Sequence, residues 1–438
     1  MNILFAAIIA AATFVWGLAA GGAVAPPGVH PWWWLRQEAI LLSGLLSIAM
    51  MSLAMLLSTR PAWLETPLGG MDRVYRAHKW AGLLAGLFAI LHWLGDQAGG
   101  PIKSAIGKAG RLPKEEYAGL LGKLQHLTKD MGEWAFYAII IMLLLALWKK
   151  FPYRPWRLLH RAMPAIYLIL AAHAALLSPF AYWRQPAGWL LALLLAVGVW
   201  AALCSLRASI GRGRRADGEI VAIELHPPAL TTVSCRLRGW RGHRPGQFAF
   251  VTFDEREGAH PFSIASADRG DGCLSFQIKA LGDYTRLLPQ RLRPGQRLRV
   301  EGPYGRFDLN RLDRRARQIW VAGGVGVTPF LAWLEALQAE PDPALAADLH
   351  YCTRARDGDP FAARLEALCA GLPGIRLSVH DDGRGERLDA GALLLDADQA
   401  RRAEIWFCGP NGLAAALKNG LRHRSEIIRF HQEAFEMR

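Results

Sequence analysis

Long apolar stretches dominate the chain up to Leu206, and they constrain its fold more than any other feature. About 20 consecutive apolar residues can cross a bilayer as a helix, which satisfies its own backbone hydrogen bonds in lipid. Six stretches are long or apolar enough, at residues 3–25, 39–58, 78–95, 134–148, 158–183 and 186–206. The sequence therefore predicts a six-helix transmembrane bundle over residues 1–206.

Basic residues flank these stretches and indicate the orientation of the bundle. Positive charge accumulates in cytoplasmic loops, and placing the amino terminus inside puts these residues on the inner side: Arg60, Arg73, Arg76, Lys79, Lys149, Lys150, Arg154, Arg157, Arg161, Arg207, Arg212, Arg214 and Arg215. The segment at 96–133 also has six basic residues, which weakens the contrast. We expect a protein of the bacterial inner membrane, in contact with lipid. Membrane-flanking arginines explain the net charge of +14 better than nucleic-acid binding does.

Neither a cleaved leader nor a disulfide framework is expected. The first stretch ends in Ala23-Val24-Ala25, which resembles a signal-peptide cleavage site, but the stretch is long and has no basic n-region. This favours a retained span. The six cysteines show no Cys-x-x-Cys and no metal-ligand spacing, so we expect no cysteine metal site and no external disulfide.

Four histidines lie inside two of the apolar stretches. His78 and His92 are fourteen residues apart, which at 100° per residue returns them to within about 40° of each other on one helix face. His160 and His173 are thirteen apart, or about 140°, which a straight helix would not tolerate, although Pro164 can kink or locally rewind it. Isolated histidines can be satisfied by neighbouring helices, but four at matched spacing favour metal binding.

The predicted topology makes the third and fifth spans parallel. His78 then lies level with His160 on the cytoplasmic side, and His92 lies level with His173 on the far side. Each pair could clamp one haem, so the sequence predicts two stacked b-type haems with two histidine ligands each.

From Arg207 onward the chain has the composition of a soluble protein. Residues 207–218 are rich in Arg and Gly and are predicted to be a linker. Short alternating runs at 219–225, 232–238, 247–253, 273–279 and 297–301 favour an antiparallel β-barrel domain over 219–312. Strands at 318–322, 348–353, 375–380 and 404–408 alternate with helical segments, which predicts an α/β parallel-sheet nucleotide domain over 313–438.

A first motif follows the strand at 247–253. It reads His260-Pro261-Phe262-Ser263-Ile264-Ala265-Ser266, and it resembles the flavin-binding motif of the NADPH oxidase and ferric reductase family. The resemblance implies that Ser263 offers its hydroxyl to the flavin ring, that His260 and Phe262 shape the pocket, and that Pro261 and Ser266 belong to the same site. A turn that merely ends a strand is the alternative.

Two further segments fit the flavin domain. In Lys279-Ala280-Leu281-Gly282-Asp283-Tyr284-Thr285 a strand ends, a glycine follows and a helix begins, so free amides and the helix dipole can face a pyrophosphate. The segment Gly302-Pro303-Tyr304-Gly305 resembles the loop that closes the flavin domain in this family. An ordinary Pro-Gly turn explains it about as well.

A glycine turn marks the nucleotide domain. It reads Val321-Ala322-Gly323-Gly324-Val325-Gly326-Val327-Thr328-Pro329, with Thr328 expected as the N-cap of a helix and Pro329 at its first position. It resembles the nicotinamide pyrophosphate loop of ferredoxin-reductase-type proteins. A plain strand-to-helix turn would not need three glycines.

Three more residue groups complete the predicted site. Arg354 ends the next strand, where a guanidinium could hold the 2′-phosphate of NADPH, although a solvated arginine is the alternative. Cys408-Gly409-Pro410 resembles the family motif whose cysteine lies beside the nicotinamide, although a buried structural cysteine is also compatible. Phe435 is the candidate for the aromatic residue that covers the flavin, but three residues follow it.

The resemblance implies a membrane flavocytochrome. Cytoplasmic NADPH would reduce FAD, and electrons would pass singly through an inner haem at His78 and His160 and an outer haem at His92 and His173. Dioxygen, giving superoxide, is the expected acceptor outside, with a ferric chelate close behind. A module that supplies electrons to a docked periplasmic enzyme is the alternative of another class, with the basic outer loop at 95–129 as its docking surface.

Overall fold

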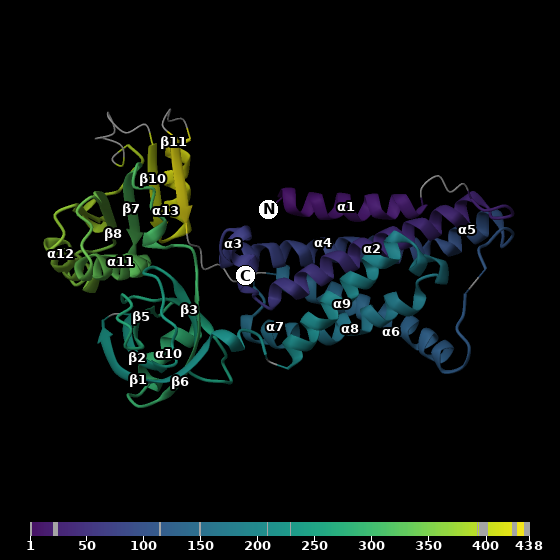
Figure 1. The fold of residues 1–438 in the computed structure, drawn as a ribbon, viewed down its shortest axis with the longest axis horizontal. Helices are drawn as coiled ribbons and strands as arrows, with labels where there is room; N and C mark the ends of the chain where they lie inside the picture. Colours follow the sequence, from purple (N-terminus) through teal and green to yellow (C-terminus); the bar gives the residue numbers. More distant parts are fainter. Residues whose placement is uncertain are drawn as a thin grey trace. The chain divides into compact units, whose positions relative to one another are not determined.

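The computed structural model describes residues 2–20, 25–113, 115–148, 150–207, 209–227, 229–391, 393, 402–422 and 427–432. The chain divides into two compact units, the first ending at Ile210 and the second beginning at Gly211. Figure 1 shows that the first unit is helical and that the second contains the strands.

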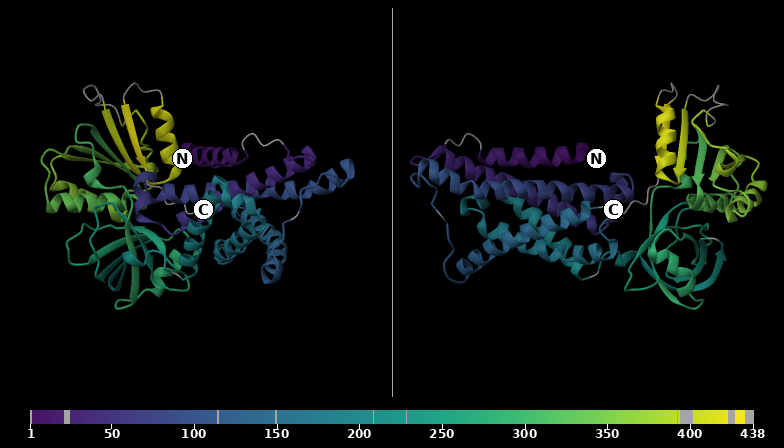
Figure 2. Two further views of the ribbon diagram at one scale, coloured as in Figure 1. Left: turned by 45° about the vertical axis from the view of Figure 1, so that its right-hand side comes forward. Right: turned by 180° about the vertical axis from the view of Figure 1, so that it is seen from behind.

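The first unit is a bundle of long helices with shorter ones between them. Figure 2 shows the long helices running side by side from two directions. The elements are α1 (Asn2–Ala20), α2 (Pro31–Ser58), α3 (Ala62–Leu68), α4 (Met71–Gln97), α5 (Gly99–Ile106), α6 (Gly119–Leu147), α7 (Tyr153–His160), α8 (Met163–Leu177), a short 3₁₀ helix (Phe180–Arg184) and α9 (Pro186–Leu206).

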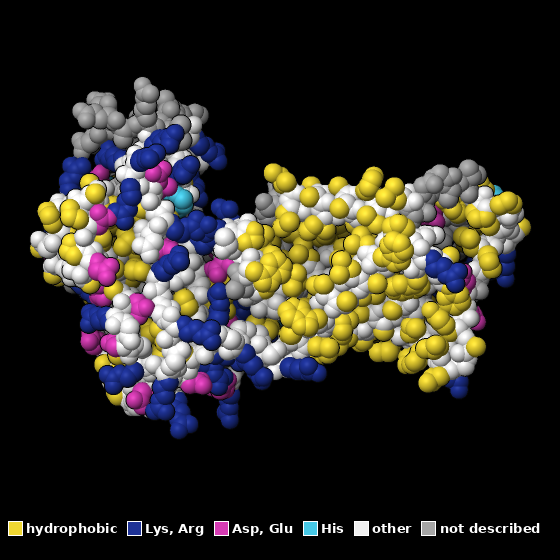
Figure 3. Space-filling view, viewed as in Figure 1, with side chains coloured by type: hydrophobic (Ala, Val, Ile, Leu, Met, Phe, Trp, Pro, Cys, Tyr) yellow, Lys and Arg dark blue, Asp and Glu magenta, His cyan; other side chains and the backbone are white. Residues whose placement is uncertain are grey.

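Four helical segments among the described residues are long and apolar enough to span a membrane: Pro31–Ser58, Gly119–Leu147, Arg154–Leu177 and Pro186–Leu206. A fifth apolar helix, Ile3–Leu18, is shorter. The predicted count of six spans is therefore not confirmed, since α1 is short and α4, which contains the predicted span at 78–95, is not among the four. Apolar side chains cover most of the visible face of this unit in Figure 3, as expected for a surface in lipid.

The fifth predicted span contains a tighter turn at residues 161–162, which is a local rewinding of the helix. Helix α7 ends at His160, a turn follows, and α8 begins at Met163. Pro164 occupies the second position of α8, where its missing N–H would be unpaired in any helix. The turn removes the conflict between a thirteen-residue spacing and a common face for His160 and His173.

Small side chains and buried hydroxyls allow the helices to pack closely. Ser47 Oγ donates to Ala85 O across α2 and α4 at 3.0 Å, and Ser52 Oγ and Tyr167 OH share a buried hydrogen bond of 2.8 Å between α2 and α8. The phenol of Tyr167 fills the space that a side chain on Gly198 would need. Close backbone approach and buried hydrogen bonds are the usual sources of helix association in membranes.

The second unit begins with an antiparallel sheet of six strands in the order β4-β3-β6-β1-β2-β5. Its elements are β1 (Arg215–His226), β2 (Leu230–Arg238), β3 (Phe248–Thr252), β4 (His260–Ser263), β5 (Cys273–Lys279), α10 (Asp283–Arg291) and β6 (Arg297–Tyr304). One bridge, between Ile264 and Phe276, joins the segment after β4 to the opposite edge strand. The antiparallel pairing is as predicted, whereas closure into a barrel stays a prediction.

A parallel sheet of five strands follows, in the order β11-β10-β7-β8-β9. Its elements are β7 (Arg317–Gly323), a 3₁₀ turn (Gly324–Val327), α11 (Thr328–Ala339), β8 (Ala347–Thr353), α12 (Pro360–Ala370), β9 (Ile375–Asp381), β10 (Arg402–Cys408), α13 (Asn411–Leu421) and β11 (Ile427–Gln432). The parallel sheet was predicted, but β11 was not. Thr328 is the first helical residue rather than the N-cap, and its Oγ donates back to Val325 O at 2.6 Å.

Aromatic packing joins the two sheets of this unit. Trp333 on α11 is fully buried, and its Nε1 donates to Pro245 O at 2.9 Å. The ring of Phe307, which lies between the two sheets in the chain, stacks on Trp333 with 5.0 Å between centroids. These contacts hold the glycine turn after β7 close to the end of β5.

Candidate functional site

The four membrane histidines lie in two facing pairs. The ring centroids of His78 and His160 are 6.0 Å apart, and those of His92 and His173 are 6.3 Å apart. Two imidazoles that bind one metal at about 2 Å from each nitrogen would have centroids roughly 6 Å apart. Each pair therefore has the separation that one shared metal requires.

Hydrogen bonds leave Nε2 as the free nitrogen in three of the four rings. The Nδ1 atoms contact backbone carbonyl oxygens, His78 with Ala54 O at 2.9 Å, His92 with Ile40 O at 2.9 Å, and His173 with Thr128 O at 3.0 Å. A carbonyl can only accept, so Nδ1 carries the proton. Neutral imidazoles with this second hydrogen bond are typical metal ligands.

Glycines make room for the two outer rings. A Cβ on Gly44 would lie 3.1 Å from His92 Nδ1, and one on Gly132 would overlap His173 Nδ1. Each glycine follows the accepting residue by four positions, Gly44 after Ile40 and Gly132 after Thr128, which is one helix turn. The missing side chain lets each imidazole reach the carbonyl one turn away.

A cavity of about 330 Å³ lies between the outer pair, with His92 and His173 in its lining. Arg36 and Asp96, which also line it, form an ion pair of 2.8 Å. The described residues hold no group of three or more His, Cys, Asp or Glu side chains that could bind a metal ion. A metal on two imidazoles alone needs its other ligands from a prosthetic group, and a haem, which brings four nitrogens, fits this donor set.

The first flavin motif forms a strand rather than a turn. His260 to Ser263 are β4, and Ser263 pairs with Phe248 on β3. Ser263 is half-buried, and its hydroxyl makes no hydrogen bond with any described residue. The ring of His260 stacks on Tyr284 of α10 with 4.4 Å between centroids, so the two predicted flavin segments meet. Pro261 and Phe262 pair with β3 beside them.

Ser266 has a structural contact instead of a free hydroxyl. Its Oγ accepts from Ser275 N at 3.1 Å, and its carbonyl oxygen accepts from His243 Nε2 at 2.9 Å. His243 also accepts from Trp240 Nε1 at 3.3 Å, and burial lowers the pKa of His243. This neutral histidine was not predicted, because a histidine in a polar turn carries no signal of burial.

The backbone amides just before α10 make hydrogen bonds within the protein. Thr285 Oγ1 accepts from the amides of Leu281 and Gly282, both at 3.0 Å, and Asp283 is the first helical residue. Part of the predicted amide cluster is thus used within the protein. Lys279, at the end of β5, is exposed, and its side chain makes no ion pair or hydrogen bond with a described residue.

Gly302 lies within β6 rather than in a closing loop. A Cβ there would lie 3.1 Å from that of Ala249. Tyr304, two residues later, is buried, and the guanidinium of Arg214 lies 4.9 Å above its ring. Strand β6 continues beyond Glu301, the last of its residues that pairs with β1, because Tyr304 still pairs with Phe248 of β3.

The glycine turn meets the end of β10. A side chain on Gly326 would overlap Cys408 O, and one on Gly323 would lie 2.7 Å from Pro410 Cδ. Gly409 is equally close, since its Cβ would lie 3.0 Å from Gly323 N. The structure thus brings together the loops before Pro329 and around Cys408. Cys408 is buried.

Lys279 of the flavin sheet approaches the same turn. Its Nζ lies 3.9 Å from the position that a Cβ would take on Gly324, whose φ of +55° suits glycine. A cation beside glycine backbone is suited to a phosphate.

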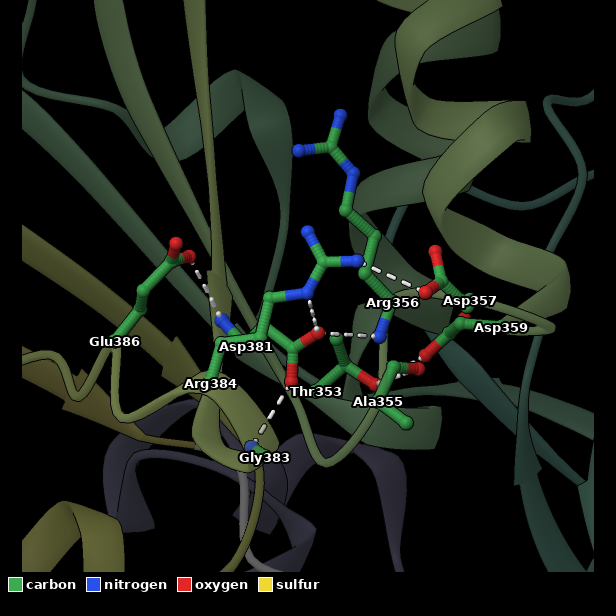
Figure 4. A network of polar contacts seen from close by, with 9 residues as sticks. All are labelled: Thr353, Ala355, Arg356, Asp357, Asp359, Asp381, Gly383, Arg384 and Glu386. Atoms are coloured by element: carbon green, nitrogen blue, oxygen red, sulfur yellow. Dashed lines mark hydrogen bonds and ion pairs between the residues drawn. The ribbon is translucent and has the colours of Figure 1, made fainter.

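Arg354 lies at the carboxyl end of β8, beside a polar network that Figure 4 shows. Asp381 at the end of β9 accepts from the amides of Arg356 and Gly383, both at 2.9 Å. The hydrogen bond from Arg356 N lowers the pKa of Asp381. Arg384 is paired with Asp357 at 2.8 Å.

Arg354 is exposed and forms no ion pair or hydrogen bond through its side chain with the described residues, so its charge is available. Phe435 lies outside the described residues.

Two known protein families match this chain. Residues 43–171 match the ferric reductase like transmembrane component, and residues 221–308 match an FAD-binding domain. The first match lies within the helical unit and the second within the unit that contains the strands. The chain is thus similar to ferric reductase-like membrane components in its first part and to FAD-binding domains in its second.

The curated relatives match only part of this chain. Methane monooxygenase component C of Methylosinus trichosporium is 31% identical over 154 residues, 34% of this chain and 44% of that protein. An NADPH oxidoreductase of Mycobacterium tuberculosis is 28% identical over 201 residues, 44% of this chain and 52% of that protein. The chain thus spans about half the length of the curated relatives it matches.

A solved structure shares the general fold. The flavohemoglobin from Malassezia yamatoensis, with bound FAD and heme, superposes with a TM-score of 0.50 over 93% of this chain and 100% of that one, at 15% identity. At this identity the similarity concerns the fold alone.

Proposed function

We propose that this ferric reductase-like protein carries electrons across a membrane, from NADPH through FAD and two haems to an acceptor on the outer face. The observation that carries the proposal is the pair of facing imidazoles at each of two levels, 6.0 Å and 6.3 Å apart. When bound, the flavin takes two electrons from NADPH and the haems pass them on singly.

In this arrangement the protein orients the histidine ligands and fixes which ring nitrogen carries the proton. Ala54 O, Ile40 O and Thr128 O hold the protons of three imidazoles on Nδ1, which leaves Nε2 unprotonated and able to bind a metal. The hydroxyl of Ser263 is available to the flavin ring. Cys408 is proposed to lie beside the nicotinamide and Phe435 to cover the flavin.

Residues are assigned to the nucleotide sites where a charged side chain makes no ion pair with a described residue, or where glycines allow a ligand to approach the backbone. Lys279 and the amides around Gly324 would hold a pyrophosphate, and Gly323, Gly326 and Gly409 allow that approach. Arg354 would bind the 2′-phosphate of NADPH, because a guanidinium can pair with a phosphate in a bidentate manner. The remaining assignments follow the motifs: Gly282, Asp283, Tyr284, Thr285, Thr328, Pro329 and Pro410 complete the two nucleotide sites.

We propose that FAD and NADPH bind on the cytoplasmic side of a bacterial inner membrane and that dioxygen is reduced to superoxide outside. Two histidines would hold each haem, so an acceptor would receive electrons without binding to the iron. A ferric chelate is the second candidate acceptor, since the outer segment carries Lys103, Lys108, Arg111, Lys123 and Lys129. Anionic chelates would be drawn to these charges, and neutral dioxygen would not.

One experiment separates the acceptors. Purified protein with FAD and NADPH should reduce cytochrome c in air in a manner sensitive to superoxide dismutase, with little dependence on salt. If anaerobic reduction of ferric citrate is faster than oxygen consumption and slows steeply with salt, the protein is a ferric reductase. Capture of a periplasmic enzyme together with negligible turnover on both acceptors would favour an electron-supply module.

The haem assignment has its own test. His92→Ala and His173→Ala should each remove the outer haem and leave flavin reduction by NADPH unchanged. Haem stoichiometry and stopped-flow flavin absorbance measure both effects. Undiminished haem content in both variants would contradict the pairing.

A further inference from the structure

The four histidines are not held alike. Both rings of the outer pair contact a backbone carbonyl through Nδ1, His92 at 2.9 Å and His173 at 3.0 Å. In the inner pair only His78 has such a contact, with Ala54 O at 2.9 Å. The Nδ1 atom of His160 is buried and has no hydrogen-bond partner among the described residues.

The backbone around His160 is also less constrained. His78 and His92 lie within the 27 residues of α4, and His173 lies within the 15 residues of α8. His160 is the last residue of α7, which has eight. After it the chain turns, with Ala162 N bonded to Leu159 O at 3.0 Å in a tighter turn than that of an α-helix. A helix end of this kind holds a side chain less firmly than a helix interior does.

An aromatic contact supports the His160 ring. Trp156, one turn earlier on α7, stacks on it with 5.0 Å between centroids and 20° between planes. Stacking fixes the plane of the imidazole, but it provides no acceptor for the Nδ1 proton. Trp156 is therefore a positioning residue for a ligand that lacks the usual second hydrogen bond.

We propose that His160 is the exchangeable ligand of the four, so that the inner pair opens to a small neutral ligand of ferrous iron while the outer pair stays closed. The inference rests on the proposed function, in which each pair holds a haem. Loss of the second hydrogen bond of a metal-bound histidine costs about 10–100-fold in metal affinity. The exchange breaks the bond from iron to His160 and forms one to the incoming ligand, and no electron is transferred.

Carbon monoxide is the probe, because it binds ferrous haem only where an axial position opens. The full-length holoprotein is reduced with dithionite under anaerobic conditions and titrated with carbon monoxide, and the difference spectrum is recorded. The expected result is one molecule bound per chain that carries two haems. The inner site should bind about 10–100-fold more tightly than the outer one.

Two double variants assign the site. His92→Ala with His173→Ala removes the outer pair and should keep one bound molecule per chain. His78→Ala with His160→Ala removes the inner pair and should bind none at the same concentration. The opposite pattern would overturn the assignment to His160.

Trp156 offers a milder test that keeps all four histidines. Trp156→Phe retains a stacked ring and should change the rate of carbon monoxide binding less than twofold, whereas Trp156→Leu should raise it severalfold. Equal rates in both variants would contradict a positioning role for Trp156.

Haem content, measured first, separates this inference from the proposed function. Fewer than two haems per chain in the wild type contradicts the proposed function, and the inference with it. Two haems with no carbon monoxide bound, or with two molecules bound per chain, contradicts the inference alone.

Discussion

Gly132 lies so close to His173 that a Cβ at position 132 would overlap the Nδ1 atom of the imidazole. The carbonyl that Nδ1 contacts, Thr128 O at 3.0 Å, lies one turn earlier on the same helix. Helix α6 therefore provides both the acceptor and the space for the ring. Helix α2 repeats the arrangement for His92 with Ile40 and Gly44, so the outer pair is held in the same way from two sides.

Gly132→Ala should displace the His173 ring and lower the haem content from about two per chain to about one. The reason is steric, because the added methyl group occupies the position of Nδ1, and displacing the contact with Thr128 O costs about 10–100-fold in metal affinity. Gly44→Ala should have a smaller effect, since its methyl group would meet His92 Nδ1 at 3.1 Å. Haem stoichiometry measures both variants.

Gly17→Ala is the matched control for these substitutions, because no atom lies within 4 Å of a Cβ at Gly17. It should leave two haems per chain. A Gly132→Ala protein with full haem content would show that the contact between α6 and His173 does not limit haem binding.

Lys279→Met should raise the KM for NADPH about five- to tenfold, because a hydrogen bond to a charged group is worth about 1.5–3 kcal/mol before screening by solvent. The ammonium that the variant loses lies 3.9 Å from the Cβ position of Gly324. The effect should shrink as salt rises. Arg297→Met, at an exposed position on β6, is the control and should leave the KM unchanged. Equal KM values in the two variants would remove Lys279 from the nucleotide site.

Arg354→Ala should raise the KM for NADPH far more than that for NADH, because only NADPH carries the additional phosphate. Steady-state kinetics with both nucleotides measures the ratio. Arg387→Ala removes a neighbouring arginine that is already paired with Asp382 at 2.5 Å, and it should affect both nucleotides alike. A uniform increase for both nucleotides in Arg354→Ala would exclude Arg354 from the 2′-phosphate site.

A histidine pair in the parallel sheet should make the second unit less stable in acid. His350 Nδ1 lies 3.0 Å from His380 Nε2. Burial lowers the pKa of His350 to about 4, with His380, Arg317 and Arg376 acting in the same direction and Asp348 opposing it. Burial also lowers the pKa of His380, which Glu386 opposes.

Because the unfolded chain takes up these protons near pH 6.5 and the folded chain does not, stability is full above that pH and falls as the pH drops toward 4. The loss for His350 should reach roughly 2–3 kcal/mol. Hydrogen-exchange protection of β8 and β9, measured from pH 7.5 to 5, tests this. His350→Gln should flatten the dependence and His226→Gln should not. A flat profile in the wild type would contradict the shift.

The sequence predicted most of the strands, because periodicity and glycine turns are local signals. The parallel strands from β7 to β10 lie within two residues of their predicted bounds, and the level of each histidine pair followed from counting residues along parallel helices. Strand β11 was missed because its six residues carry no clear alternation, and its place beside β10 depends on pairing with a distant segment.

The contacts between helices could not be predicted from the sequence. Nothing in the pattern around Gly132 indicates that His173 fills the space, since that depends on how α6 meets α8. The turn between His160 and Met163 was expected as a kink or a local rewinding, and the sequence could not decide between them because Pro164 is compatible with either. The free side chain of Arg354 likewise depends on which acidic residues other arginines have paired with.

The central claim is that electrons pass from NADPH through the flavin to both histidine-bound haems. Anaerobic stopped-flow absorbance of the FAD-loaded protein, followed at flavin and haem wavelengths after NADPH is added, tests it most directly. The account predicts that flavin absorbance falls first and that two haems per chain are then reduced, with the second phase halved in His92→Ala with His173→Ala. Flavin reduction without any haem reduction in the wild type would contradict it.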